Sequence, residues 1–165
     1  MKTLGLVKTF KAHSDRITGL VELKNGWLAS SSEDMTIKLW DPSNGQLIKT
    51  LKEHTKWVTC LTELNNGQLA SGSLDRTIKI WDINKGTSVK TLSGHTGKVT
   101  GLVQLKSNGN YLASTGDKTV KLWDVNTGQL VKSFEGHHED VTSIVELNDG
   151  VIASGSLDKT IRLWG

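Results

Sequence analysis

The chain has 165 residues, of which 36% are hydrophobic, and its 20 basic and 17 acidic residues leave a formal net charge of +3. Because this charge is small and the charged residues are interspersed, we expect a solvated surface and no nucleic-acid partner. The sequence has no apolar run of about 18 residues, and its start lacks the apolar centre of a secretory signal. We therefore expect a soluble globular protein with no membrane partner.

The first predicted element is a strand at residues 6–10, whose sequence LVKTF matches LIKTL at residues 47–51. After it the chain repeats itself, because four histidines are spaced by 41, 41 and 42 residues and four tryptophans by 41, 42 and 41. This period indicates tandem structural repeats within one domain spanning residues 1–165. We place the repeats at about 11–51, 52–92, 93–134 and 135–165, with an outer strand at 4–10 that completes the last one.

Each repeat has the pattern of four short strands, which is clearest in the second. Strands are predicted there at 58–64 (VTCLTEL), 68–73 (QLASGS), 77–81 (TIKIW) and 87–92 (TSVKTL). Asn65-Asn66-Gly67 is a turn signal, and TIKIW alternates apolar and polar residues, as a strand with two different faces does. No stretch holds the period of a helix, so the pattern predicts an all-β fold.

The last two repeats depart from this pattern. The third gains two residues near 107–110 and loses one before Asp117, so we expect its turns to differ. The fourth ends with its third strand at 160–164 and lacks an outer strand, whereas the strand at 6–10 has no inner strands before it. The two ends are complementary parts of one repeat, and this trimming is typical of an excised or engineered fragment.

Cys60 is the only cysteine, so no intrachain disulfide and no cysteine-based zinc site can form. A reducing, cytoplasmic location is therefore expected. Gly19, Gly101 and Ser143 hold the matching place in the other repeats. We accordingly interpret Cys60 as a small buried residue and not as a reactive thiol.

Each repeat contains a closely similar block that ends at its tryptophan. The blocks are LASSSEDMTIKLWD (28–41), LASGSLDRTIKIWD (69–82), LASTGDKTVKLWD (112–124) and IASGSLDKTIRLWG (152–165). Four such blocks in register resemble the WD-repeat family of β-propellers, and the resemblance implies four four-stranded blades per chain. The glycine that this family has before its histidine is kept only at His95 and His137, and the last block ends in Trp-Gly.

The resemblance also implies a hydrogen-bonded chain of His, Ser, Asp and Trp in each blade. By position the sets are His13, Ser30, Asp34 and Trp40; His54, Ser71, Asp75 and Trp81; His95, Ser114, Asp117 and Trp123; and His137, Ser154, Asp158 and Trp164. Buried polar groups need such partners, whereas a nucleophilic triad needs one asymmetric site with an oxyanion pocket. We therefore expect no catalytic residues, no metal and no cofactor.

The loops of one face vary between repeats, and the resemblance implies that a protein or peptide docks there. The candidate residues are Arg16, Glu33, Trp57, Leu74, Lys98, Asp140 and Leu157. Trp57 stands out because its counterparts in the other repeats are charged, and exposed aromatics are common interface anchors. The alternative interpretation is that Trp57 folds onto its own blade.

Four blades are few for one ring. Propellers hold four to eight blades, and the turn per blade is about 45° in a ring of eight but about 90° in a ring of four. We expect two chains to close one eight-bladed ring as a homodimer. The alternative is a monomeric four-bladed ring closed by the same pairing of chain ends.

The sequence thus favours a non-enzymatic scaffold for protein–protein interaction. The main alternative is a self-assembling half-propeller, natural or engineered, with no partner beyond itself. A propeller enzyme or a lectin-like ring would need a cluster of unmatched carboxylates or aromatics at the channel, and Trp57 alone fits that description.

Overall fold

The computed structural model describes residues 5–165, which form fifteen β-strands in four antiparallel sheets. The first sheet consists of β1 (Ile17–Glu22), β2 (Leu28–Ser32), β3 (Ile37–Asp41) and β4 (Gln46–Leu51). The second consists of β5 (Val58–Glu63), β6 (Leu69–Ser73), β7 (Thr77–Asp82) and β8 (Thr87–Ser93). The third consists of β9 (Val99–Gln104), β10 (Tyr111–Gly116), β11 (Thr119–Asp124) and β12 (Leu130–Glu135). The fourth consists of β13 (Val141–Glu146), β14 (Ile152–Ser156) and β15 (Ile161–Trp164).

Local sequence accounts for these strands and their order. In β7 the apolar Ile78 and Ile80 are buried while Lys79 between them is partly exposed, as the alternation of TIKIW predicts. Gly67 lies in the turn between β5 and β6 with a φ of 80°. Glycine adopts this conformation without steric cost because it has no Cβ. Within each sheet, neighbouring strands are consecutive in the chain. The all-β fold and the predicted strands of the second repeat are confirmed, with ends that differ by one residue.

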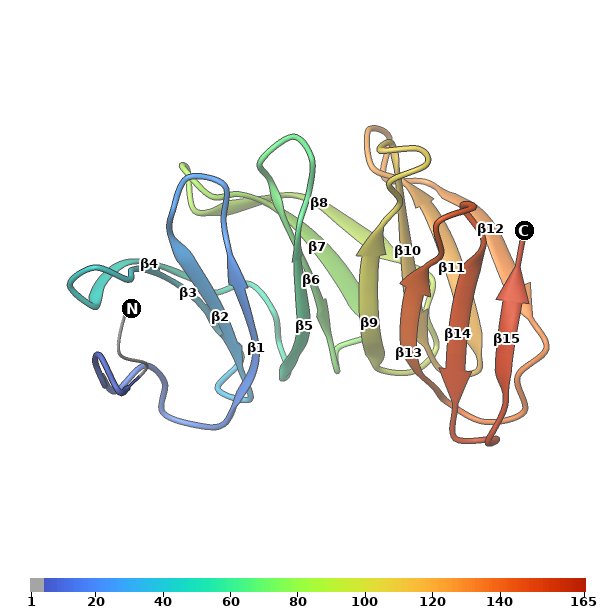
Figure 1. Cartoon of the computed structure of the whole chain (residues 1–165), viewed down its shortest axis with the longest axis horizontal. Coiled ribbons are helices and arrows are strands. Elements are labelled where there is room, and N and C mark those ends of the chain that lie inside the picture. The colour runs from blue at the N-terminus through green and yellow to red at the C-terminus, as the bar shows by residue number, and fades with distance from the viewer. Residues whose placement is uncertain (1–4) are drawn as a thin grey trace.

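The four sheets stand side by side in an open row (Figure 1). The first strands of successive sheets, β1, β5, β9 and β13, lie next to one another along the inside of the row, and the fourth strands lie on its outside. The N-terminal segment lies beside the first sheet and β15 lies at the far end of the fourth (Figure 1). The first described residues, 5–10, are therefore well separated from β15 in this arrangement. Among the described residues, no helix that could cross a membrane is present.

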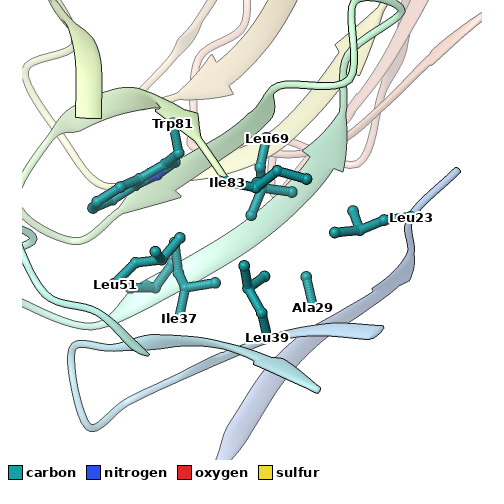
Figure 2. Packing of buried hydrophobic residues seen from close by; sticks show 9 residues of the cluster. Leu23, Ala29, Ile37, Leu39, Leu51, Leu69, Trp81 and Ile83 are labelled. Atoms are coloured by element: carbon teal, nitrogen blue, oxygen red, sulfur yellow. The ribbon is translucent and has the colours of Figure 1, made fainter. Parts of the chain in front are cut away.

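The hydrophobic core is divided into three clusters, one between each pair of adjacent sheets. Between the first two sheets, Ile37 and Leu39 of β3 face Leu69 and Trp81 of the second sheet (Figure 2). The other two clusters repeat this packing between the second and third sheets and between the third and fourth. Burying each large aliphatic side chain contributes roughly 1.5–3 kcal/mol. The contacts between sheets are therefore the main source of stability.

The predicted outer strand at 4–10 is not a strand in the single chain. Its first residue lies outside the described residues, and residues 5–10 form no ladder with any sheet. The fourth sheet accordingly has three strands, as predicted for a repeat that lacks an outer strand. A strand needs a neighbour to satisfy its backbone groups, and β15 lies at the opposite end of the row (Figure 1).

The innermost two strands of each sheet share a complementary pair of small residues. Gly19 is paired with Ser31, Cys60 with Gly72, Gly101 with Thr115 and Ser143 with Gly155. Each pair contains one glycine, and the partner fills the space that the glycine leaves. A Cβ added at Gly72 would lie 2.7 Å from Cys60 Sγ and 2.5 Å from Val99 Cγ1. Cys60 is partly buried, and burial raises the pKa of its thiol to about 11, which fits the expected packing role.

We predict that Gly72→Ser lowers the free energy of unfolding by about 1–3 kcal/mol, because it overpacks the contact with Cys60 and Val99. Adding Cys60→Gly recreates the Gly19–Ser31 arrangement of the first sheet and should restore part of this loss. Chemical unfolding of the wild type, both single variants and the double variant measures the coupling between the two sites. Strict additivity would contradict this packing explanation.

Candidate functional site

The predicted polar chain is continuous in the second sheet. The Trp81 Nε1–H donates to Ser71 Oγ at 2.8 Å, and Ser71 Oγ lies 2.7 Å from His54 Nε2. On the other side of the ring, His54 Nδ1 lies 2.8 Å from Asp75 Oδ2. His54 lies in the loop before β5, Ser71 on β6, Asp75 in the β6–β7 turn and Trp81 on β7. These hydrogen bonds therefore tie β6, β7 and the turn between them to the loop that enters β5.

The direction of each hydrogen bond follows from what each group can donate. Asp75 is ionised and only accepts, so the proton of the neutral His54 ring sits on Nδ1. His54 Nε2 must then accept, and the Ser71 hydroxyl donates to it while accepting from Trp81. Burial lowers the pKa of His54, although Asp75 opposes this effect, and burial thus favours the neutral ring that this arrangement requires.

Asp75 is a structural anchor that accepts hydrogen bonds from three further donors. It accepts hydrogen bonds from the backbone and hydroxyl of Thr77 and from the backbone of Thr55. Burial alone would raise the pKa of Asp75, but the bonds from Thr77 and His54 outweigh it and lower the pKa to about 2. The ionised carboxylate therefore stabilises the fold above its ordinary pKa of 3.8, and this contribution is lost as the pH falls toward 2.

The other three sets are built in the same way. Each tryptophan donates to its serine at 2.7–2.8 Å, and each serine lies 2.7–2.9 Å from its histidine. The third sheet differs, because His95 Nδ1 lies 3.4 Å from Asp117. Here the shortened turn places Asp117 itself at a positive φ of 51°, whereas in the other sheets the residue after the aspartate has the positive φ. This is the altered turn expected from the deletion.

The serine hydroxyl of each polar chain is held by hydrogen bonds on both sides. Ser71 Oγ is buried and lies between Trp81 and His54, and the equivalent serines are held in the same way. His138, the second histidine of the His-His pair, is exposed, and its backbone donates to Asp158. The threonine two residues after each aspartate was missed by the sequence analysis. Its recurrence at the repeat period was the signal that could have found it.

The candidate partner-binding residues lie in two loops of each sheet. In three of the four sheets a backbone hydrogen bond joins these two loops. The Leu74 backbone donates to the Trp57 carbonyl at 2.9 Å, and the same bond links Glu33 to Arg16 and Leu157 to Asp140. Trp57 is 47% exposed, so it does not fold completely onto its own blade. Arg16 and Lys98 are exposed, while Glu33, Leu74 and Asp140 are partly buried. Arg16 lies 3.8 Å from Glu33 as a surface ion pair.

Antiparallel sheets that adjoin through their first strands, each with a buried Trp–Ser–His–Asp chain, define the blades of a β-propeller. The model of the WD domain, G-beta repeat, matches residues 4–41, 45–82, 86–124 and 128–165, so the chain belongs to the WD40 repeat family. Each of the last three matched units begins with the outer strand of one blade and ends with the third strand of the next. The expected family is thus confirmed.

Two solved structures of designed proteins are similar to the chain. The computationally designed Ika4 protein has a TM-score of 0.84 and 35% identity, with 94% of each chain covered. The computationally designed Ika8 protein has a TM-score of 0.83 and 36% identity, and the match covers 94% of this chain but 48% of the Ika8 chain. The chain therefore spans about half the length of Ika8. No curated protein matches it.

We predict that Trp81→Phe lowers the thermal unfolding midpoint more than Trp57→Phe does. Phenylalanine keeps most of the apolar contact but removes the donor to the buried Ser71 hydroxyl, and losing a partner of a buried polar group costs about 1–3 kcal/mol. Trp57 lies outside the polar chain and serves as the matched control. Equal midpoints in parallel thermal scans would show that the indole donor contributes no stability.

Proposed function

We propose that the chain is an interaction scaffold that binds a protein or peptide on the loop face around Trp57. WD repeats generally serve as interaction scaffolds. The observation that carries the choice of face is the 47% exposure of Trp57 at a place where the other blades have charged residues. A large aromatic ring at an exposed position supplies contact area at little entropic cost and commonly anchors an interface.

The surroundings of Trp57 support a protein partner. Leu74 lies beside it through the backbone hydrogen bond, and Leu157 is 61% exposed at the matching place of the fourth blade. Arg16, Lys98 and Asp140 add charges of both signs. An aromatic centre with a mixed polar rim suits a protein surface, whereas nucleic acid would call for a concentrated positive patch. For the scaffold we propose a reducing cytoplasmic location, which its single cysteine suits.

We also propose that two copies of the chain form one eight-bladed ring. The row of four sheets is open, and each end of the row exposes apolar side chains that the internal contacts bury. The likeness to about half of the Ika8 chain supports a ring of twice this length. Pairing two equal halves through a twofold axis produces a closed assembly with two identical contacts.

A second candidate is a self-assembling half-propeller with no other partner, such as an engineered repeat protein. The similarity to the designed proteins Ika4 and Ika8 favours this alternative. The two candidates share the same ring and differ only in whether the loop face binds a further molecule. Binding experiments on Trp57 therefore separate them.

We predict that Trp57→Ala weakens partner binding by at least about 2 kcal/mol, as the loss of a central aromatic anchor does. A partner is first recovered on immobilised wild-type protein, and its dissociation constant is then measured for both forms. Val89→Ala is the control, because it shortens an exposed apolar side chain away from Trp57, on β8, and this variant should bind normally. Unchanged affinity of the Trp57 variant would exclude this face, and finding no partner would favour the self-assembling alternative.

We predict that light scattering at low micromolar concentration gives about twice the 18.0 kDa mass of one chain. The unfolding midpoint should rise with protein concentration, because folding and association are linked in such an assembly. A folded species with the mass of a single chain would contradict the two-copy ring.

A further inference from the structure

The contacts between successive blades use the same set of groups three times. The first of these is a bridging threonine on the innermost strand. Thr18 Oγ1 donates to Val58 O, Thr59 to Val99 O and Thr100 to Val141 O, at 2.5–2.6 Å. Thr142 holds this place in the last blade, where its hydroxyl reaches only Gly155 O at 3.3 Å in its own sheet. The matching carbonyl on the open face of the first blade is that of Ile17.

The second repeated contact joins a loop backbone to a side chain of the next blade. The Lys24 backbone donates to Glu63, the Asn65 backbone to Gln104 and the Lys106 backbone to Glu146. By the same spacing, the last blade offers the backbone of Asn148, and the first blade offers the carboxylate of Glu22. Glu22 is exposed, whereas Glu146, which occupies the same place in an internal contact, is buried.

The third repeated contact involves the end of each outer strand, and residues 8–10 make it already. Phe134 of β12 packs on Trp164 of the next blade with ring centroids 5.6 Å apart, and Phe10 packs on Trp40 in the same way at 5.1 Å. The Lys49 ammonium of β4 donates to Asn84 O in the next blade, and the Lys8 ammonium donates to Ser43 O at 3.3 Å. Residues 8–10 therefore lie against the first blade as the outer strand of a preceding blade would.

The last blade has a matching unfilled position on β15. In the second and third blades, a lysine of the third strand donates to the hydroxyl opposite it on the outer strand. These bonds are Lys79 to Thr91 at 3.0 Å and Lys121 to Ser133 at 2.9 Å. Arg162 takes this place on β15, and its buried Nε has no hydrogen-bond partner among the described residues. Thr9 is the residue that matches Thr91 and Ser133 by spacing.

The apolar surfaces at the two ends of the row are complementary as well. A groove of about 260 Å³ on the first blade is lined by Phe10, Ile17, Leu20 and Trp40 among others. In the first internal contact, Ile37 and Leu39 of β3 pack into the equivalent space. Their counterparts on β15, Ile161 and Leu163, are 77% and 63% exposed. The two exposed faces thus have the same composition as the two sides of an internal contact.

We propose that the open face of the first blade binds the last blade of a second copy, and that residues 6–10 become the fourth strand beside β15 of that copy. This inference rests on the proposed two-copy ring. The register of β7 and β8 places Phe10 opposite Ile161, Thr9 opposite Arg162 and Lys8 opposite Leu163. The Arg162 guanidinium then donates to the Thr9 hydroxyl, Thr142 reaches Ile17 O, and the Asn148 backbone reaches Glu22.

A second copy is favoured over the same chain because the two complementary faces lie at opposite ends of the row (Figure 1). The three internal contacts are alike, and the chain as a whole superimposes on about half of the Ika8 protein. Bringing the ends of one chain together would require every internal contact to turn about twice as far, and tightly packed interfaces resist such distortion.

Cross-linking tests the register directly. In a Cys60→Ser background, Thr9→Cys and Arg162→Cys place two thiols on directly opposite residues, which lie close enough for a short bis-maleimide to join them. Because both partners are replaced together, no buried donor is left without an acceptor. We expect a covalent species of twice the chain mass on a denaturing gel. Thr50→Cys with Arg162→Cys is the control and should not cross-link, since Thr50 is already opposite Lys38 within its own sheet.

Each other outcome of this experiment overturns the inference in a recognisable way. A cross-link within one chain would mean that a single copy closes its own ring. A dimer by light scattering that fails to cross-link at these positions would refute the strand exchange while leaving the two-copy ring intact. A folded monomer without a cross-link would refute both.

A second measurement uses single substitutions in the otherwise unchanged protein. Thr9→Val leaves the Arg162 donor buried and unpaired at both contacts, so we expect the dimer dissociation constant to rise by about tenfold or more. Thr50→Val is the matched control, because Lys38 donates to Ala12 O and does not depend on Thr50. Equal dissociation constants for the two variants would overturn the Thr9–Arg162 pairing.

Discussion

Every blade of this protein is a thin sheet with two apolar faces, and neither face can be buried without a neighbouring blade. Ile37 and Leu39 are fully buried because the second blade covers them, whereas their counterparts Ile161 and Leu163 on the last blade are exposed. The packing of sheet against sheet is therefore the interaction on which the rest of the structure depends. It sets the division of the core into three clusters, the row-like shape of the chain and the apolar surfaces at both ends. A single blade of about 40 residues has no stable way to exist alone.

The polar chain within each blade serves this packing by fixing the sheet from inside. Trp81 fills space in the contact with the first blade while its indole nitrogen reaches Ser71, so one side chain contributes to both the apolar core and the polar chain. His54 and Asp75 continue the chain to the loop and turn at the edge of the sheet. The loops of that edge consequently have a rigid base, even though their exposed residues differ from blade to blade. A fixed base with variable tips is what an interaction scaffold requires.

Much of this architecture could be predicted from the sequence, because a period of 41 or 42 residues places equivalent residues in equivalent surroundings. The strands, the turns at Asn-Gly and the altered turn at Asp117 follow from local pattern. What could not be predicted depends on which residues meet across strands and blades. The pairing of Cys60 with Gly72 requires the β5–β6 register, and the unsatisfied Arg162 Nε requires knowing that β15 has no outer neighbour among the described residues. The position of Phe10 against Trp40 was also hidden, since residues 6–10 look like a strand yet form no ladder in the single chain.

In the small-residue pairs at the inner edge, the strand that carries the glycine changes from one blade to the next. The glycine is on the first strand at Gly19 and Gly101, but on the second strand at Gly72 and Gly155. Blades of two kinds therefore alternate, and the side chains that fill the vacant space differ accordingly, Leu61 above Gly19 but Val99 above Gly72. A fourth blade followed by another first blade continues this alternation without a fault. A ring with an odd number of such blades would have to bring two of the same kind together, whereas an even number of blades keeps the alternation throughout.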